Sequence, residues 1–149
     1  ILTMRNLAKL EKKDTKALRE LARAAKRPFA VKGIFTQEDV ELVRELKPDV
    51  AVVSNHGGRI ETNRGSTADF LAKHGRDLSR YCGEIWVDGG IRCARDLQTA
   101  WALGAREVMI ARPFITALLK DGLQGIRHSI QSQFSLPLPQ ENAQDAREA

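Results

Sequence analysis

Residues 50–59 read VAVVSNHGGR, a continuous β-branched apolar run followed at once by polar residues and glycines. Such a run, bounded by turn residues, is typical of a strand buried on both faces of a parallel sheet. Three further short apolar runs lie at residues 29–31, 85–87 and 107–110. Helical patterns with capping residues and terminal prolines or glycines separate them. The sequence therefore predicts an α/β fold with four βα units around a parallel sheet.

Several residues mark the expected helix boundaries. Thr36 and Asp39 have the spacing of a capping box at the start of one helix. Ser66 is suited to cap the following helix, which comes after the strand at residues 50–53. The last helical pattern begins near residue 114 and is interrupted at residues 121–122, which read Asp-Gly. These signals predict where the helices that connect the strands begin and end.

The interior of the fold is expected to contain the large apolar residues. We expect Trp86 and Trp101 to lie in the core, because large aromatic side chains bury most of their surface in globular domains. We expect Val31, Val52 and Val87 to face the interior of the closed sheet.

The composition is that of an ordinary globular protein. The chain has 149 residues, of which 42% are apolar and 29% charged. These values exclude a collagen, a long disordered chain and a bundle of membrane helices. We expect one domain over residues 1–134 and a disordered polar tail over residues 135–149.

The charge balance of +5 fits binding of a phosphate or carboxylate group as well as of nucleic acid. Zinc, Walker and nucleic-acid motifs are absent from the sequence, so neither a metal nor a nucleic-acid partner is expected. No stretch has the length of a membrane span. Cys82 and Cys93 lack CxxC spacing, which favours a reducing, cytoplasmic location.

Polar residues and glycines follow each predicted strand. In a parallel α/β fold the C-terminal strand ends share one edge, where ligands bind. Arginines and glycines there favour a phosphate site, His56 is suited to act as a general base, and Arg59 is suited to hold a carboxylate. The residues expected to converge are Lys32, Ser54, His56, Arg59, Asp88, Gly89, Gly90, Arg92 and Arg112.

These stretches resemble, in order and spacing, one protein family: the FMN-dependent α-hydroxy acid oxidases and dehydrogenases, such as lactate oxidase and glycolate oxidase. The resemblance runs from about Leu18 to about Gly125. The matching pieces are PFAVKGI (28–34), VVSNHGGR (52–59), WVDGGIR (86–92) and ALGAREVMIARPF (102–114).

The resemblance implies a (β/α)8 TIM barrel with FMN at its C-terminal rim. The four strands match the family's last four, and a whole barrel needs about 250 residues, so we expect this chain to be a fragment, the C-terminal half of a barrel. The implied reaction is oxidation of an L-2-hydroxy acid, such as lactate or glycolate, to the 2-oxo acid. His56 would accept the proton, and Arg59 would hold the carboxylate.

The resemblance also assigns the cofactor contacts. Lys32 would stabilise negative charge at flavin N1 and O2, and Ser54 would contact the flavin. The family usually has glycine where this chain has Ala111, and Leu-Asp where it has Glu61 and Thr62. The loop around the ribityl chain and phosphate would comprise Asp88, Gly89, Gly90, Ile91 and Arg92, and the phosphate site would be completed by Ala111 and Arg112.

Two alternatives remain open from the sequence. One is a catalytically inactive half-barrel that binds phosphate or assists assembly without the N-terminal half. The other is a different phosphate-binding barrel enzyme, such as an FMN-linked isomerase, against which the pairing of His56 with Arg59 speaks. The expected partners are a small 2-hydroxy acid and either further copies of the chain or the N-terminal half of the barrel.

Overall fold

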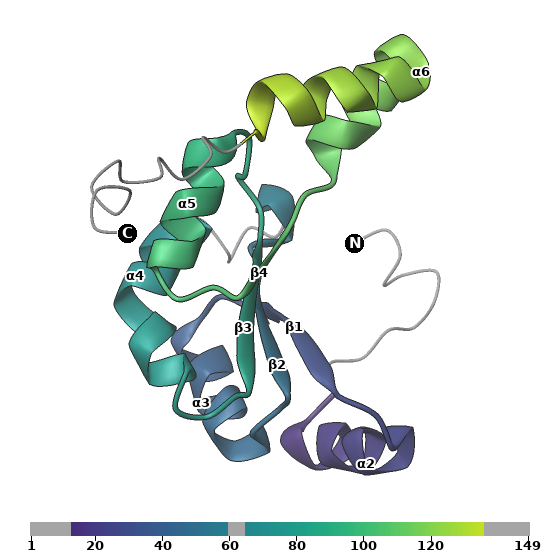
Figure 1. Ribbon diagram of the computed structural model, residues 1–149. Helices are drawn as coiled ribbons and strands as arrows, with labels where there is room; N and C mark the ends of the chain where they lie inside the picture. Colours follow the sequence, from purple (N-terminus) through teal and green to yellow (C-terminus); the bar gives the residue numbers. More distant parts are fainter. Residues whose placement is uncertain (1–12, 60–64, 136–149) are drawn as a thin grey trace, which may run out of the picture.

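The computed structural model describes residues 13–59 and 65–135 (Figure 1). Their four strands form one parallel sheet in the order β1-β2-β3-β4, so each strand pairs with the next along the chain. The strands are β1 (Ala30–Ile34), β2 (Val50–Val53), β3 (Glu84–Asp88) and β4 (Glu107–Met109). The four apolar runs of the sequence are the four strands, and the predicted parallel α/β arrangement is confirmed.

The helices are α2 (Thr15–Ala25), α3 (Gln37–Leu46), α4 (Thr67–Leu78), α5 (Ala94–Ala102) and α6 (Arg112–Gln133), and a 3₁₀ turn, η1 (His56–Gly58), follows β2. The capping box is formed: the Thr36 hydroxyl accepts from the Asp39 N–H at 3.2 Å, and the Asp39 carboxylate accepts from the Thr36 N–H at 2.9 Å. Ser66 caps α4. The predicted break at residues 121–122 is present as a kink inside α6, where Gly122 has a φ of 60°.

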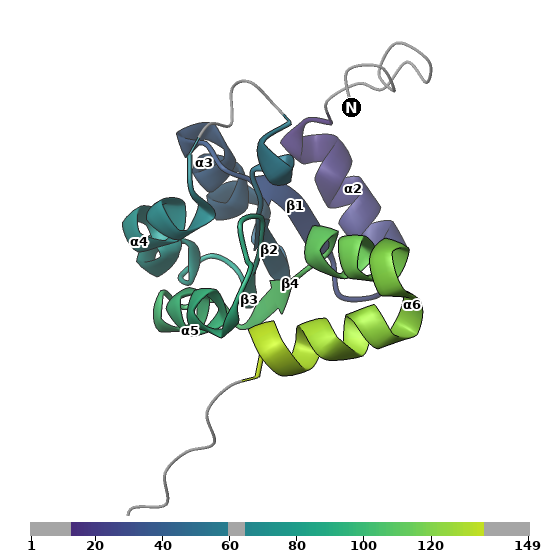
Figure 2. The same cartoon turned by 90° about the horizontal axis from the view of Figure 1, so that it is seen from above.

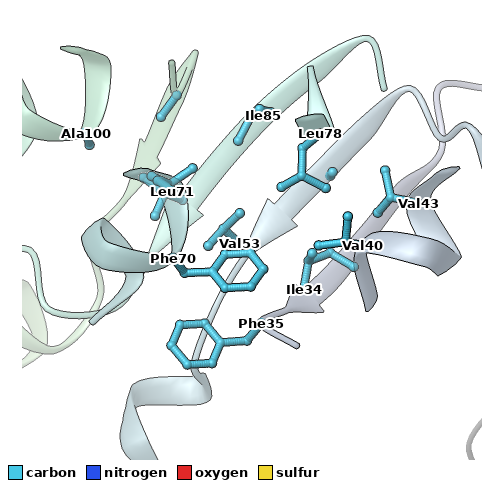
Figure 3. Packing of buried hydrophobic residues seen from close by; sticks show 13 residues of the cluster. Ile34, Phe35, Val40, Val43, Val53, Phe70, Leu71, Leu78, Ile85 and Ala100 are labelled. Carbon is cyan, nitrogen blue, oxygen red and sulfur yellow. The ribbon is translucent and has the colours of Figure 1, made fainter. Parts of the chain in front are cut away.

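The core lies between the sheet and helices α3, α4 and α5, which run along one side of the strands in Figure 2. Side chains from one face of β1, β2 and β3 meet side chains from these helices (Figure 3). Phe35 and Phe70 stack with ring centroids 5.2 Å apart. The fully buried members include Ile34, Val40, Val43, Val53, Leu71, Leu78 and Val87.

Two predictions about side-chain direction are wrong. Val87 belongs to the core cluster on the helix side and Val31 packs against it, so neither faces the barrel interior. Val31 is paired in register with Ala51, and alternate residues of a strand point to opposite faces, which places both on the helix side. Val52, paired with Lys32, is buried outside that cluster.

The tryptophans are less buried than expected. Trp101 is 42% exposed on α5, so its prediction as a core residue is wrong. Trp86 is half-buried, and its Nε1 donates to the Glu84 carboxylate at 2.8 Å, which lets the indole remain at the surface of β3.

The predicted tail and the residues Glu61 and Thr62 lie largely or wholly outside the described residues, because residues 1–12, 60–64 and 136–149 are not described. In the part of the chain that is described, no helix has the length and apolarity needed to span a bilayer.

Candidate active site

The C-terminal ends of the four strands surround one cavity of about 400 Å³. Ten of the eleven predicted site residues line it: Lys32, His56, Arg59, Asp88, Gly89, Gly90, Ile91, Arg92, Ala111 and Arg112. The eleventh, Ser54, is fully buried and contacts the cavity through the amine of Lys32. The structure therefore brings together the residues that the sequence placed at one edge of the sheet.

Lys32, Ser54 and Asp88 form a polar cluster at the ends of β1, β2 and β3. The Lys32 amine donates to Ser54 Oγ at 2.8 Å and forms an ion pair with Asp88 Oδ2. Asp88 Oδ1 is buried and has no hydrogen-bond donor among the described residues. Since a buried carboxylate oxygen needs a donor, Asp88 is suited to accept a hydrogen bond from a bound hydroxyl group.

His56 begins the turn that follows β2. Its backbone has a φ of 53°, in the left-handed region, and its N–H donates to Ser54 Oγ at 3.2 Å. Burial lowers the pKa of the imidazole below its ordinary value, and the nearby Lys32 amine lowers it further, against the opposing effect of Asp88 and Asp39. A lowered pKa keeps the imidazole neutral at neutral pH, which is the form that can accept a proton.

The Nδ1 atom of the His56 ring has no hydrogen-bond partner among the described residues. The atom is also buried. A base is held in one tautomer when this nitrogen donates to an acceptor. An acceptor for the Nδ1 proton would therefore have to come from outside the described residues.

Asn55 and Thr67, which the sequence analysis did not single out, hold the rim loops in place. Asn55 accepts from the Gly57 N–H at 3.0 Å, and its side-chain amide donates to the Gly65 carbonyl at 3.0 Å. Thr67, buried at the start of α4, donates to the Gly89 carbonyl at 3.0 Å. Asn55 lies next to His56 in the sequence, which is the one signal that could have marked it.

The loop after β3 packs closely on the loop after β2. Gly89 has a φ of 86°, and a Cβ atom on it would lie 2.5 Å from Asn55 Oδ1. Only glycine fits there, because the position combines a left-handed backbone with no room for a side chain. Beyond Gly89, the Asp96 carboxylate accepts from the backbone N–H groups of Arg92 at 2.7 Å and Cys93 at 3.1 Å. This bond fixes the arginine at the start of α5.

Arg92 and Arg112 both line the cavity and give it positive charge. Arg112 is the first residue of α6, so its side chain adds to the partial positive charge of a helix N-terminus. Its guanidinium donates to the Gly57 carbonyl at 3.2 Å, while that of Arg92 donates to the Ile91 carbonyl at 2.8 Å. Ala111 has a φ of −121°, so the methyl group that replaces the family's usual glycine causes no backbone strain.

The fold and this cavity define a class: a parallel α/β protein with arginines and glycines at the C-terminal rim of its sheet. The sequence profile of the FMN-dependent dehydrogenase family matches residues 4–133. The chain belongs to that family, as its sequence predicted, and FMN is the cofactor that the family uses.

Individual relatives agree with this assignment. The chain is 36% identical over 100 residues to 2-hydroxyacid oxidase 2 of Rattus norvegicus, an alignment covering 67% of this chain and 28% of the relative. A mandelate oxidase variant with a monooxide FMN adduct superposes with a TM-score of 0.71 at 31% identity, covering 82% of this chain and 38% of the other. A flavocytochrome b2 variant with pyruvate bound gives a TM-score of 0.69 at 33% identity, covering 80% and 31%.

These structures are TIM-barrel flavoenzymes, so the four parallel strands are consistent with part of a (β/α)8 barrel. The chain spans less than two fifths of the length of each of these relatives.

The described residues fit FMN. The phosphate carries negative charge, which Arg92, Arg112 and the start of α6 are suited to bind. The ribityl chain carries hydroxyl groups, and Asp88 Oδ1, which accepts no hydrogen bond from the described residues, is suited to accept one from such a group. These groups line the same cavity as His56. The cavity can therefore hold a phosphorylated cofactor on one side and present a base on the other.

Proposed function

We propose that the full-length protein oxidises an L-2-hydroxy acid to the corresponding 2-oxo acid, with FMN as the electron acceptor. One observation carries the proposal: His56, Arg59 and the arginine pair Arg92 and Arg112 line a single cavity. This combination supplies a base, a carboxylate ligand and a phosphate site. The names of the relatives, which include a 2-hydroxyacid oxidase, support the same reaction.

His56 is the proton acceptor in this proposal. The α-carbon hydroxyl of the substrate gives its proton to Nε2 of the imidazole, whose lowered pKa keeps it unprotonated beforehand. FMN, when bound, accepts the hydrogen and the two electrons that leave the α-carbon. Loss of both hydrogens from the C–OH group leaves the C=O group of the 2-oxo acid.

Arg59 and Lys32 provide positive charge in the same cavity as the base. Arg59 follows η1 and lines the cavity, where its guanidinium binds the substrate carboxylate through two parallel hydrogen bonds. Lys32 is held by Ser54 and Asp88, so its amine is already oriented toward the cavity and stabilises negative charge on the reduced cofactor ring.

Replacing the base tests the proposal. His56→Gln in the full-length protein is expected to lower turnover by about 10²–10⁴, the usual contribution of one general base, while FMN remains bound. His128→Gln, an exposed histidine on α6 that does not line this cavity, is the matched control and leaves turnover unchanged. Turnover is measured with lactate and glycolate, and bound FMN by its visible absorbance. Near-normal turnover of His56→Gln contradicts the assignment.

The inactive phosphate-binding half-barrel is the alternative that the same arginine pair supports. The two functions differ in what a hydroxy acid does to bound flavin. Adding lactate or glycolate without oxygen bleaches the FMN absorbance if the protein is an oxidoreductase, and leaves it unchanged if the protein only binds phosphate.

A further inference from the structure

Gly33 interrupts the regular pairing of β1 with β2. Lys32 is paired with Val52, and Ile34 with the next residue, Val53, so the register skips Gly33. Gly33 has a φ of 101°, which only glycine adopts readily. Such a bulge re-aims the side chains on either side of it. Here Lys32 faces the cavity and Ile34 is 1% exposed in the core.

The imidazole of His56 occupies the space where a side chain at position 33 would be. An ideal Cβ on Gly33 would lie 2.6 Å from His56 Cε1 and 3.2 Å from Nε2. Cβ atoms do not approach other heavy atoms as closely as 2.6 Å, so one of the two groups would have to move.

The backbone of His56 cannot easily move to make room for a side chain at position 33. It lies in the left-handed region, with its N–H bonded to Ser54 Oγ, and Ser54 is fully buried beneath Lys32. The next residue, Gly57, is fixed by the Asn55 side chain. Rotation of the imidazole about its side-chain torsions is therefore the least restricted response to a group added at position 33.

We propose that Gly33 is a positioning residue for His56: the missing side chain leaves the space in which the imidazole rests, and any side chain there displaces the ring from the cavity. The catalytic consequence rests on the proposed role of His56 as proton acceptor. The coupling between the two positions does not, and it is measured separately.

A matched pair of variants separates the contact from backbone strain. Gly33→Ala and Gly104→Ala place the same methyl group at similar φ values, 101° and 96°, but nothing lies within 4 Å of a Cβ on Gly104. Each is made in the full-length protein with His56 intact and with His56→Ala, and unfolding by urea gives the equilibrium constants.

With His56 intact, Gly33→Ala is expected to lower the folding equilibrium constant roughly tenfold more than Gly104→Ala, a coupling typical of side chains in direct contact. In the His56→Ala background the two glycine variants become equivalent, because the ring is gone. Equal effects of Gly33→Ala in both backgrounds overturn the proposal. If Gly33→Ala does not fold, folding of Gly33→Ala with His56→Ala supports the proposal, and failure of that double variant overturns it.

The position of the ring is also visible by NMR, where the resonance of His56 is identified by its loss in His56→Gln. Burial and Lys32 lower the pKa of His56, and Asp88 and Asp39 oppose them. When Gly33→Ala moves the ring toward solvent, the pKa of His56 is expected to rise toward its ordinary value. Gly104→Ala should leave the titration of His56 unchanged.

The catalytic readout keeps the two proposals distinct. Gly33→Ala is expected to lower kcat through His56, so that in the His56→Gln background it has no further effect on kcat. If His56→Gln itself retains turnover, the proposed function fails while the stability cycle and the titration still report the coupling. An unchanged titration of His56 in Gly33→Ala overturns the positioning role whatever His56 does in the reaction.

Discussion

Arg59 is directed to the cavity by the unusual backbone before it. His56, Gly57 and Gly58 have positive φ values of 53°, 70° and 74°, after which Arg59 returns to a φ of −89°. This left-handed turn spans residues 56–58 and begins three residues after the end of β2. The proposed base, His56, and the proposed carboxylate ligand, Arg59, thus lie on one short turn.

Arg59→Lys keeps the charge but loses the two-point geometry that a guanidinium offers a carboxylate. We expect KM for hydroxy acids to rise and kcat to fall, since the substrate is held less well and in a less fixed orientation. Steady-state kinetics with the acid and with its neutral amide measure the effect. Arg95→Lys, on the exposed side of α5, is the control. Equal use of acid and amide by the unaltered protein would show that Arg59 does not read the carboxylate.

At this scale the sequence indicates which residues meet but not how they pair. In the sequence Lys32 and Asp88 each come directly after an apolar run, which was enough to place both at the rim, although in the structure Lys32 lies within β1 and Asp88 is the last residue of β3. Their ion pair depends on the bulge at Gly33, which sets the direction of Lys32, and nothing in the local sequence reports a skipped register position. The hydrogen bonds from the Asn55 and Thr67 side chains were not predicted, because each is accepted by a backbone carbonyl of another loop.

Among the elements, α6 carries Arg112, a residue of the proposed phosphate site, at its first position. Arg112→Ala is expected to weaken FMN binding by about 10- to 100-fold, as for loss of a hydrogen bond to a charged group. Arg127→Ala, on the same helix but away from the cavity, is the matched control. Titration of FMN fluorescence against the apoprotein gives both dissociation constants. Equal effects of the two substitutions on the dissociation constant would show that Arg112 does not bind the FMN phosphate.

The capping box of α3 follows directly after β1. Thr36→Ala removes the hydroxyl that accepts from the Asp39 N–H and is expected to reduce the free energy of unfolding by about 1 kcal/mol. Thr99→Ala is the control, because the Thr99 hydroxyl donates to Arg95 within α5 and caps nothing. Urea unfolding followed by circular dichroism checks both. A midpoint of Thr36→Ala equal to that of the control would mean that the cap contributes little here.

The positions of the strands were predictable, and the faces of the strands were not. The runs at residues 29–31, 50–53 and 85–87 are apolar at every position, so they carry no alternation to tell one face from the other. That is why Val31 and Val87 were assigned to the wrong side. Trp101 was misplaced for a related reason: helix α5 is short, and its buried residue is Ala100, one position away.

For the molecule as a whole, the described sheet has two open edges, β1 and β4. A closed barrel has none, and an unpaired edge strand favours pairing with another chain. The helix α6 adds exposed apolar side chains: Ile115, Leu118, Leu119 and Leu123 are 55%, 45%, 82% and 70% exposed. Burying each fully would contribute roughly 1.5–3 kcal/mol.

We therefore expect the isolated 149-residue chain to associate, through its open edges and α6, or to be stable only with the remaining part of the barrel. Light scattering on the isolated chain measures its mass, and a thermal melt measures its cooperativity. A monodisperse monomer with a cooperative melt would contradict this expectation. Replacing Leu119 and Leu123 by Gln should weaken association without altering the sheet, because both side chains lie in solvent.

The order of the strands has a consequence for synthesis. Since each strand pairs with the next one along the chain, the sheet can be assembled from β1 onward as the chain leaves the ribosome. Lys32 meets Ser54 once β2 is in place, but Asp88 lies 56 residues after Lys32, and Arg112 lies 55 residues after the Gly57 carbonyl that it contacts. The proposed phosphate site is thus the last part of the described rim to form, because a nascent chain lacks Arg112 at this site until α6 has emerged.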